Sequence, residues 1–238
     1  MATPITAKSD RYGFKVVDAA KGREAEIWIY EEIGVGWFGG LSASQFVKDI
    51  KEIGSVDRIL LHINSPGGEV SDGVAIYNVL RQHKARKIVH VDALAASIAS
   101  VIAMAGDEIH MADNALMMIH NAWGLSMGYA EDMRKTADIL DKFDGTIVAT
   151  YQKRTKLDES KIKELMASET WMNAQEAVDY GFADDVTDAL EIAAHFDLSK
   201  FKYRNIPERM VPPAGDLRVK LARMSLAARR IASSPRKQ

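Results

Sequence analysis

The stretch Arg58–Gly68 reads R-I-L-L-H-I-N-S-P-G-G, an apolar run directly followed by a turn that contains proline and two glycines. The run Arg58–Ile63 predicts a buried strand. After the turn, Asp72–Gln82 carries apolar residues at helical spacing and predicts a helix. This order of strand, turn and helix is typical of a βαβ unit with parallel strands.

The same alternation of strand and helix continues on both sides of this stretch. Further strands are expected at 26–30, 87–91, 108–111, 115–119 and 183–186. Further helices are expected at 95–105, 127–154, 157–167 and 174–180, with one more that follows an N-cap at Ser42 or Ser44 and ends at Ile53. Strands that alternate with helices predict an α/β domain.

Composition excludes several classes of function. The chain has 238 residues, of which 47% are hydrophobic and 27% charged, so it can bury a sizeable core. A net charge of -2 argues against binding of nucleic acid by bulk electrostatics. The absence of cysteine excludes disulfides and a cysteine nucleophile. No H-x-x-x-H or H-E-x-x-H pair occurs, so we expect neither a metal site nor a cofactor.

Targeting signals are also missing from the sequence. Residues 1–11 are polar and lack the apolar region of a secretory signal. The most apolar segment, 89–105, is interrupted by Asp92 and is shorter than the roughly 20 residues that a membrane span needs. We therefore expect a cytoplasmic protein without a membrane partner.

The end of the chain differs in charge from the rest. Residues 207–238 carry a net charge of +6, whereas residues 1–206 carry -8. Prolines and a glycine mark the junction, and apolar residues then recur at helical spacing among arginines: Leu217, Leu221, Met224, Ala228 and Ile231. The sequence thus predicts a domain at 1–206 and a basic extension at 207–238 that is helical or partly disordered.

Three segments carry candidate chemistry. The glycines that follow Asn64-Ser65-Pro66 leave their N–H groups open to an anion or an oxyanion, although a sharp turn is the commoner explanation of such a segment taken alone. Ser97 opens the helix expected at 95–105, where it is either a nucleophile or an N-cap, and Ser100 is expected to pack. His120 leaves the strand expected at 115–119 for a loop, where α/β sheets place their sites, although a lone histidine is more often structural.

The spacing and order of these segments resemble the serine-peptidase family typified by the Clp proteolytic subunit. The matching segments are I-N-S-P-G-G at 63–68, A-A-S at 95–97 before a helix ending in Ala105-Gly106, M-M-I-H at 117–120 and Q-E-A-V-D-Y-G at 175–181 followed by Ala183-Asp184. The resemblance covers roughly residues 25–188.

The resemblance implies a role for each segment. Ser97 would be the nucleophile, His120 the general base, and the N–H groups of Gly68 and Ile98 the oxyanion hole. The implied fold is the Clp-protease and crotonase-like spiral of βαβ units. The helix at 127–154 would be the handle through which rings of subunits pair, so a homo-oligomeric ring acting on protein or peptide substrates is expected.

The third catalytic residue is harder to assign. The family has an aspartate here, and a count back from Gly181 without gaps reaches Leu165, which cannot accept a hydrogen bond. Glu169 lies four residues later and is the predicted third member, with Asp158 and Glu159 as more distant alternatives. A backbone carbonyl or a side-chain amide could also orient His120, and Glu169 would then only cap or solvate a helix end.

The wording E-T-W at 169–171 and the long C-terminal extension resemble the phage and prophage branch of the family. That branch trims scaffold and capsid proteins during head maturation. We therefore expect a serine endopeptidase in the host cytoplasm or the prohead, with capsid, scaffold or portal proteins as partners. The alternatives are a housekeeping peptidase working with an ATP-dependent unfoldase, a crotonase-like enzyme of acyl-CoA, and an assembly protein with a degenerate site.

Overall fold

The structure is a computed structural model that describes residues 11–19, 22–35, 40–188, 198 and 201–207. The chain divides into two units, Met1–Phe196 and Asp197–Gln238, and the elements below belong to the first. Beyond Pro207, the predicted basic extension and its apolar stripe lie outside the described residues. The domain boundary predicted at residue 206 stays a prediction.

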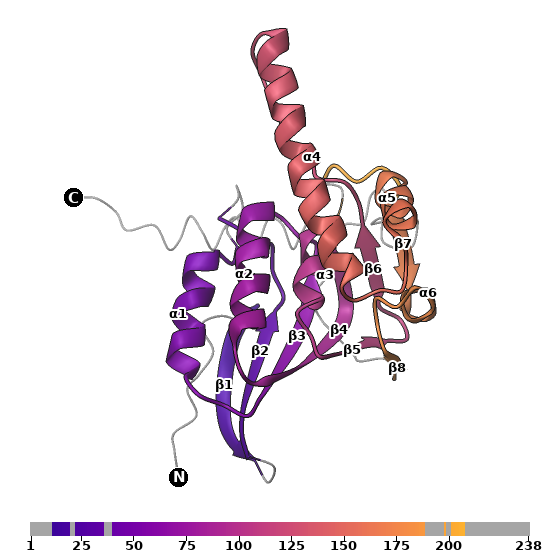
Figure 1. Cartoon of the computed structure of the whole chain (residues 1–238). Coiled ribbons are helices and arrows are strands. Elements are labelled where there is room, and N and C mark those ends of the chain that lie inside the picture. Colours follow the sequence, from indigo (N-terminus) through magenta and orange to yellow (C-terminus); the bar gives the residue numbers. More distant parts are fainter. Residues whose placement is uncertain (1–10, 20–21, 36–39, 189–197, 199–200, 208–238) are drawn as a thin grey trace, which may run out of the picture. The chain divides into compact units, whose positions relative to one another are not determined.

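The described residues form a mixed α/β structure, as expected (Figure 1). Its strands are β1 Tyr12–Ala19, β2 Gly22–Ile29, β3 Arg58–Ser65, β4 Arg86–Ala96, β5 Glu108–Ala112, β6 Leu116–Ile119, β7 Thr170–Asn173 and β8 Asp185–Thr187. Its helices are α1 Ala43–Ile53, α2 Val70–Gln82, α3 Ile98–Ala103, α4 Ala130–Gln152, α5 Glu159–Ala167 and α6 Ala174–Tyr180.

All eight strands join one sheet. Its main order is β1-β2-β3-β4-β5-β8, while β6 pairs with β4 and β7 pairs with β6. The neighbours from β2 to β8 run parallel, as does β4 with β6, because a helix or loop crosses between them. The pairs β1–β2 and β6–β7 are antiparallel.

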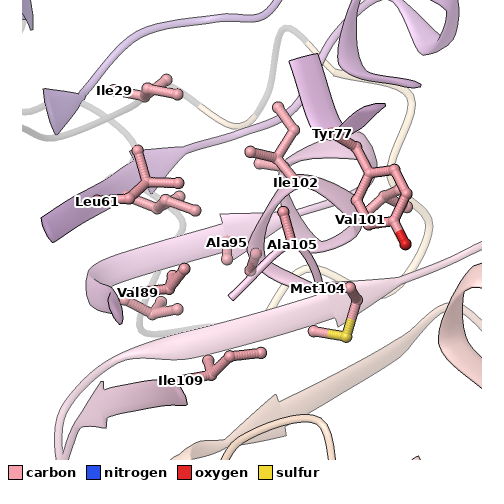
Figure 2. Close-up of a cluster of buried hydrophobic side chains, with 14 of the residues drawn as sticks. Ile29, Leu61, Tyr77, Val89, Ala95, Val101, Ile102, Met104, Ala105 and Ile109 are labelled. Atoms are coloured by element: carbon pink, nitrogen blue, oxygen red, sulfur yellow. The ribbon is translucent and has the colours of Figure 1, made fainter. Parts of the chain in front are cut away.

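The core lies between one face of this sheet and helices α2 and α3. The side chains of Leu61, Val89 and Ile109 extend from neighbouring strands into this core. Tyr77 of α2 and Ile102 of α3 belong to the same buried cluster (Figure 2). Each of these strand residues is fully buried. Period-two burial of apolar residues thus anchors the strands whose ends carry the candidate site.

The fourth strand has two different partners along its length. Residues Ile88–Val91 of β4 pair with β5, whereas Leu94–Ala96 pair with β6. The helix expected at 95–105 is therefore shorter than predicted, because Ala95 and Ala96 still belong to the strand. The change of partner brings the end of β4 beside the end of β6.

The long helix predicted at 127–154 is present as α4, and its N-terminal half projects beyond the sheet in Figure 1. Its buried residues all lie in the C-terminal half. Strands β1 and β7 were not expected from the sequence. Among the described residues, we find no helix long and apolar enough to span a membrane.

Candidate active site

Ser97 lies at a strained turn between β4 and α3. Its backbone has φ 55° and ψ -129°, a conformation that non-glycine residues rarely adopt. Ser97 occupies the N-cap position of α3, but its side chain makes no capping hydrogen bond to the helix. Sharp strand-to-helix turns of this kind present a nucleophile at the end of a sheet.

The paired strands bring His120 to this turn. The Ser97 N–H donates to the Met118 carbonyl at 2.9 Å, which extends the pairing of β4 with β6 by one step. His120 follows β6 directly, and its Nε2 lies 2.8 Å from Ser97 Oγ. The structure thus brings the two predicted residues within hydrogen-bond distance, in a site where His120 is only 8% exposed.

The glycine turn after β3 packs against the Ser97 turn. A Cβ on Gly67 would lie 2.6 Å from the Ala96 carbonyl oxygen and 2.8 Å from Ser97 Cβ, so no larger residue fits without a shift. The Ser65 hydroxyl fastens the turn by donating to the Glu31 carbonyl at 2.7 Å. The close approach explains why this turn needs glycine.

Backbone geometry leaves two N–H groups for an acceptor. Ile33 donates to the Gly67 carbonyl and accepts from the Glu69 N–H, so the N–H of Gly68 between them points away from Ile33. The N–H of Ile98 belongs to the first residue of α3 and has no acceptor within the helix. Gly68 follows Gly67, which packs against Ser97 and the Ile98 nitrogen, so the oxyanion hole of Gly68 and Ile98 stays a prediction that this geometry permits.

The antiparallel ladder of β6 and β7 ends one residue before His120 on one strand and one residue after Glu169 on the other. Ile119 pairs with Thr170, so the next residue outward on each strand is His120 on β6 and Glu169 before β7. Glu169 is only 2% exposed, and the Trp171 indole N–H donates to its carboxylate at 3.3 Å.

The alternatives to Glu169 lie elsewhere. Leu165 packs in the hydrophobic core from α5, so the gapless count that reached it does not identify a site position. Asp158 caps the start of α5 through the Lys161 N–H, and Glu159 pairs with Lys163 on the surface. The burial of Glu169 is also incompatible with a carboxylate that only solvates a helix end.

Two residues of the candidate site have a strained backbone. Ser97 and Glu169 are the two non-glycine residues with positive φ in the part of the chain that the structure describes. Such conformations cost about 1–3 kcal/mol each and cluster at functional sites. Ser97 lies at hydrogen-bond distance from His120, and Glu169 precedes the Thr170 that pairs with Ile119, the residue before His120.

Two features of this site were missed by the sequence. Strand β7 was overlooked, although its Thr-Trp pair before the helix cap at Asn173 is a short strand signal. Ser100 was expected only to pack; it is buried, but its hydroxyl also donates to the Ser97 carbonyl. The sequence offers no signal for that bond, since it depends on the turn geometry at Ser97.

Among the described residues, we find no group of three or more histidine or acidic side chains placed to hold a metal ion. The arrangement that remains is a serine hydroxyl on an imidazole nitrogen, with backbone donors close to the same turn. This arrangement can remove a proton from Ser97 and accommodate negative charge on a substrate oxygen.

Comparison with known proteins identifies relatives of this chain. The model of the Clp protease family matches residues 23–189, which is more than half of the sequence. The ATP-dependent Clp protease proteolytic subunit of Deinococcus radiodurans is 37% identical over 133 residues. That match covers 55% of this chain and 65% of the relative, so the chain spans slightly less than two thirds of the relative's length.

Proposed function

Because this chain belongs to the Clp protease family, we propose that it is a serine endopeptidase with Ser97 as nucleophile and His120 as general base. The observation that carries this proposal is the 2.8 Å distance between Ser97 Oγ and His120 Nε2. The crotonase-like alternative is disfavoured because the matching family is a peptidase family. A degenerate assembly protein would have no reason to keep the pair at hydrogen-bond distance.

The proposed reaction follows from this geometry. His120 Nε2 takes the Ser97 hydroxyl proton while Oγ attacks the carbonyl carbon of the peptide bond. The carbonyl oxygen becomes negatively charged and accepts hydrogen bonds from the N–H groups of Gly68 and Ile98. His120 then passes its proton to the leaving amine, and a water molecule, activated in the same way, releases the acyl group from Ser97.

We assign Glu169 as the third member of this site. An imidazole base needs an acceptor for its second ring N–H, which sets the tautomer and stabilises the charged ring. The position of Glu169 at the same end of the β6–β7 ladder as His120, its burial and its strained backbone support this assignment.

Covalent labelling tests the catalytic proposal directly. A fluorophosphonate probe reacts with activated serines, and peptide mapping identifies the modified residue. We expect modification of Ser97 and none of Ser100, because the Ser100 hydroxyl is buried and engaged with a carbonyl. A correctly folded protein that remains unlabelled, or is labelled elsewhere, would contradict the proposal.

We propose that the substrates are phage or prophage scaffold and capsid proteins. The E-T-W segment and the basic extension at 207–238 support this role. The second candidate is a peptidase that works with an ATP-dependent unfoldase, and the name of the Deinococcus radiodurans relative favours it. Incubation with scaffold protein encoded beside this gene, and separately with an unfoldase, ATP and a folded substrate, distinguishes the two roles.

We also propose that the protein assembles as a homo-oligomeric ring through α4 and the segment before it. Apolar residues alternate along this segment and are exposed: Trp123, Leu125, Met127 and Tyr129. Leu125 is 89% and Met127 98% exposed, which an isolated protomer would leave in contact with water. Light scattering at micromolar concentration should give a mass of several protomers, and a monodisperse monomer would contradict the ring.

A further inference from the structure

One face of α4 is directed at the candidate active site. Asp144, Ile147, Val148 and Tyr151 fall on the same side of the helix, because seven residues make about two helical turns. Ile147 and Val148 pack in the hydrophobic core between the other two residues. The polar atoms of Asp144 and Tyr151 therefore occupy the two ends of a buried stripe.

The first end of the stripe reaches the Ser97 turn through a chain of hydroxyls. Ser100 Oγ donates to the Ser97 carbonyl and lies 2.8 Å from the hydroxyl of Tyr151. Since the single proton of Ser100 is used on Ser97, the Tyr151 hydroxyl is the donor to Ser100. Burial raises the pKa of Tyr151, which keeps this donor protonated.

The second end reaches the chain that leaves His120. Asp144 accepts the N–H of Ala122, two residues beyond His120, at 2.6 Å. Residues 122–126 run antiparallel to α4. A Cβ at Gly124 would contact Leu140 of the helix, and the Thr136 hydroxyl donates to Ser126. The path of the chain after His120 is thus set by α4.

We propose that α4 holds both members of the Ser97–His120 pair in register, with Tyr151 and Asp144 as positioning residues at its two contacts. The inference rests on the proposed peptidase function and extends it to residues that touch neither substrate nor reacting atoms. Seven residues of one rigid helix separate the two contacts, so the helix sets the distance between the Ser97 turn and the strand end that carries His120.

The physical need for such a device follows from two features of the site. Ser97 is held in a strained conformation, which persists only when the surrounding structure enforces it. Displacement of a catalytic group by about 1 Å can reduce a rate roughly 100-fold. The bond from Ser100 to the Ser97 carbonyl acts on the strained residue itself, and Tyr151 orients that bond.

Hydroxyl deletion at Tyr151 tests the inference with a matched control. Tyr151→Phe removes only the donor to Ser100, while Tyr12→Phe removes a buried tyrosine hydroxyl that donates to Asp49, far from the site in the sequence and in the sheet. Each variant is measured for kcat, KM, the rate of fluorophosphonate labelling and Tm. Asp144→Ala is measured in the same way as the second contact.

We expect Tyr151→Phe and Asp144→Ala each to lower kcat and the labelling rate about ten-fold with KM within two-fold, whereas Tyr12→Phe should lower only Tm. The double variant Ser100→Ala/Tyr151→Phe should lose no more than the poorer single variant, because both residues act through one bond. Wild-type kcat in both Tyr151→Phe and Asp144→Ala, or equal losses in Tyr12→Phe, would overturn the inference. A wild-type protein that is never labelled would instead refute the proposed peptidase function.

Discussion

Histidines occupy two contrasting regions of the sheet. His62, His90 and His110, here called the histidine row, lie at matching register on β3, β4 and β5. Their rings stack with centroids 5.0 and 5.3 Å apart, and His62 also hydrogen-bonds Asp92. His120 lies beyond the end of β6 and contacts the hydroxyl of a strained serine.

The surroundings of the histidine row shift the pKa values of its members. Burial and the neighbouring rings of His62 and His110 lower the pKa of His90. Burial also disfavours a charged His62, but the hydrogen bond and the negative charge of Asp92 outweigh it and raise the pKa of His62. The row therefore links protonation to folding, whereas His120 contacts a serine hydroxyl and is the general base of the proposed reaction.

The largest expected difference between the two regions is in kcat, and removal of the Ser97 hydroxyl tests it. Ser97→Ala is expected to lower kcat by about 1000-fold or more, because no other group replaces the nucleophile. Little contact area is lost, so Tm should stay within about 2 °C of wild type. Peptide hydrolysis measured on the purified variant checks this, and unchanged turnover would remove Ser97 from the mechanism.

A smaller effect is expected at the neighbour of His120. Glu169→Gln keeps the shape of the side chain but removes the charge that would stabilise a protonated His120, so kcat should fall more than ten-fold with little change in Tm. Steady-state kinetics and a thermal melt are compared with those of Glu159→Gln, a surface carboxylate on α5. Wild-type kcat in Glu169→Gln would leave Ser97 and His120 acting as a dyad.

The sequence predicts many of the elements around the candidate site, but not all of them. Local patterns identified β3, α2, α6 and the glycine turn, because burial periodicity and turn residues are properties of short segments. Strand β7 and the partner change of β4 were missed, since pairing depends on contacts far apart in the chain. Glu169 is proposed from its place in the sequence, and its burial beside the end of the β6–β7 ladder depends on a pairing that the sequence does not reveal.

The histidine row was invisible in the sequence for a related reason. Its three members are separated by 28 and 20 residues, and only the register of the parallel strands brings them together. Conversely, the helix expected at 95–105 begins only after Ser97, because Ala95 and Ala96 lie in a strand. The strain at Ser97 is a consequence of that tertiary pairing.

Replacement in the row should alter pH-dependent stability rather than turnover. Because the folded pKa of His90 is lowered, the unfolded state binds more protons near pH 6, and stability is lost as the pH falls from about 7 toward 5. His90→Gln removes this proton uptake, so its Tm should fall a few degrees less than that of wild type between pH 7 and 5. If Tm falls equally with pH in His90→Gln and in wild type, or if His90→Gln loses kcat ten-fold, the histidine row does not act on stability alone.

The smallest expected effect has the opposite sign. The raised pKa of His62 means that its charged form stabilises the folded state below about pH 6.5, and this contribution disappears as the pH rises through the folded pKa. His62→Gln keeps a donor near Asp92 but cannot be charged. Its Tm should be slightly below wild type at pH 5, and the gap should close by pH 8. A gap that is constant across this range would show that Asp92 needs only a neutral donor.

The exposed apolar alternation from Trp123 to Tyr129 has a consequence for how the protein survives in the cell and in the test tube. A freshly made chain presents this segment with an uncovered row of large apolar side chains, and exposed apolar patches of this kind favour aggregation. Folding and assembly are then in competition with precipitation. Expression at high concentration should therefore deplete soluble protein before it yields well-behaved single protomers.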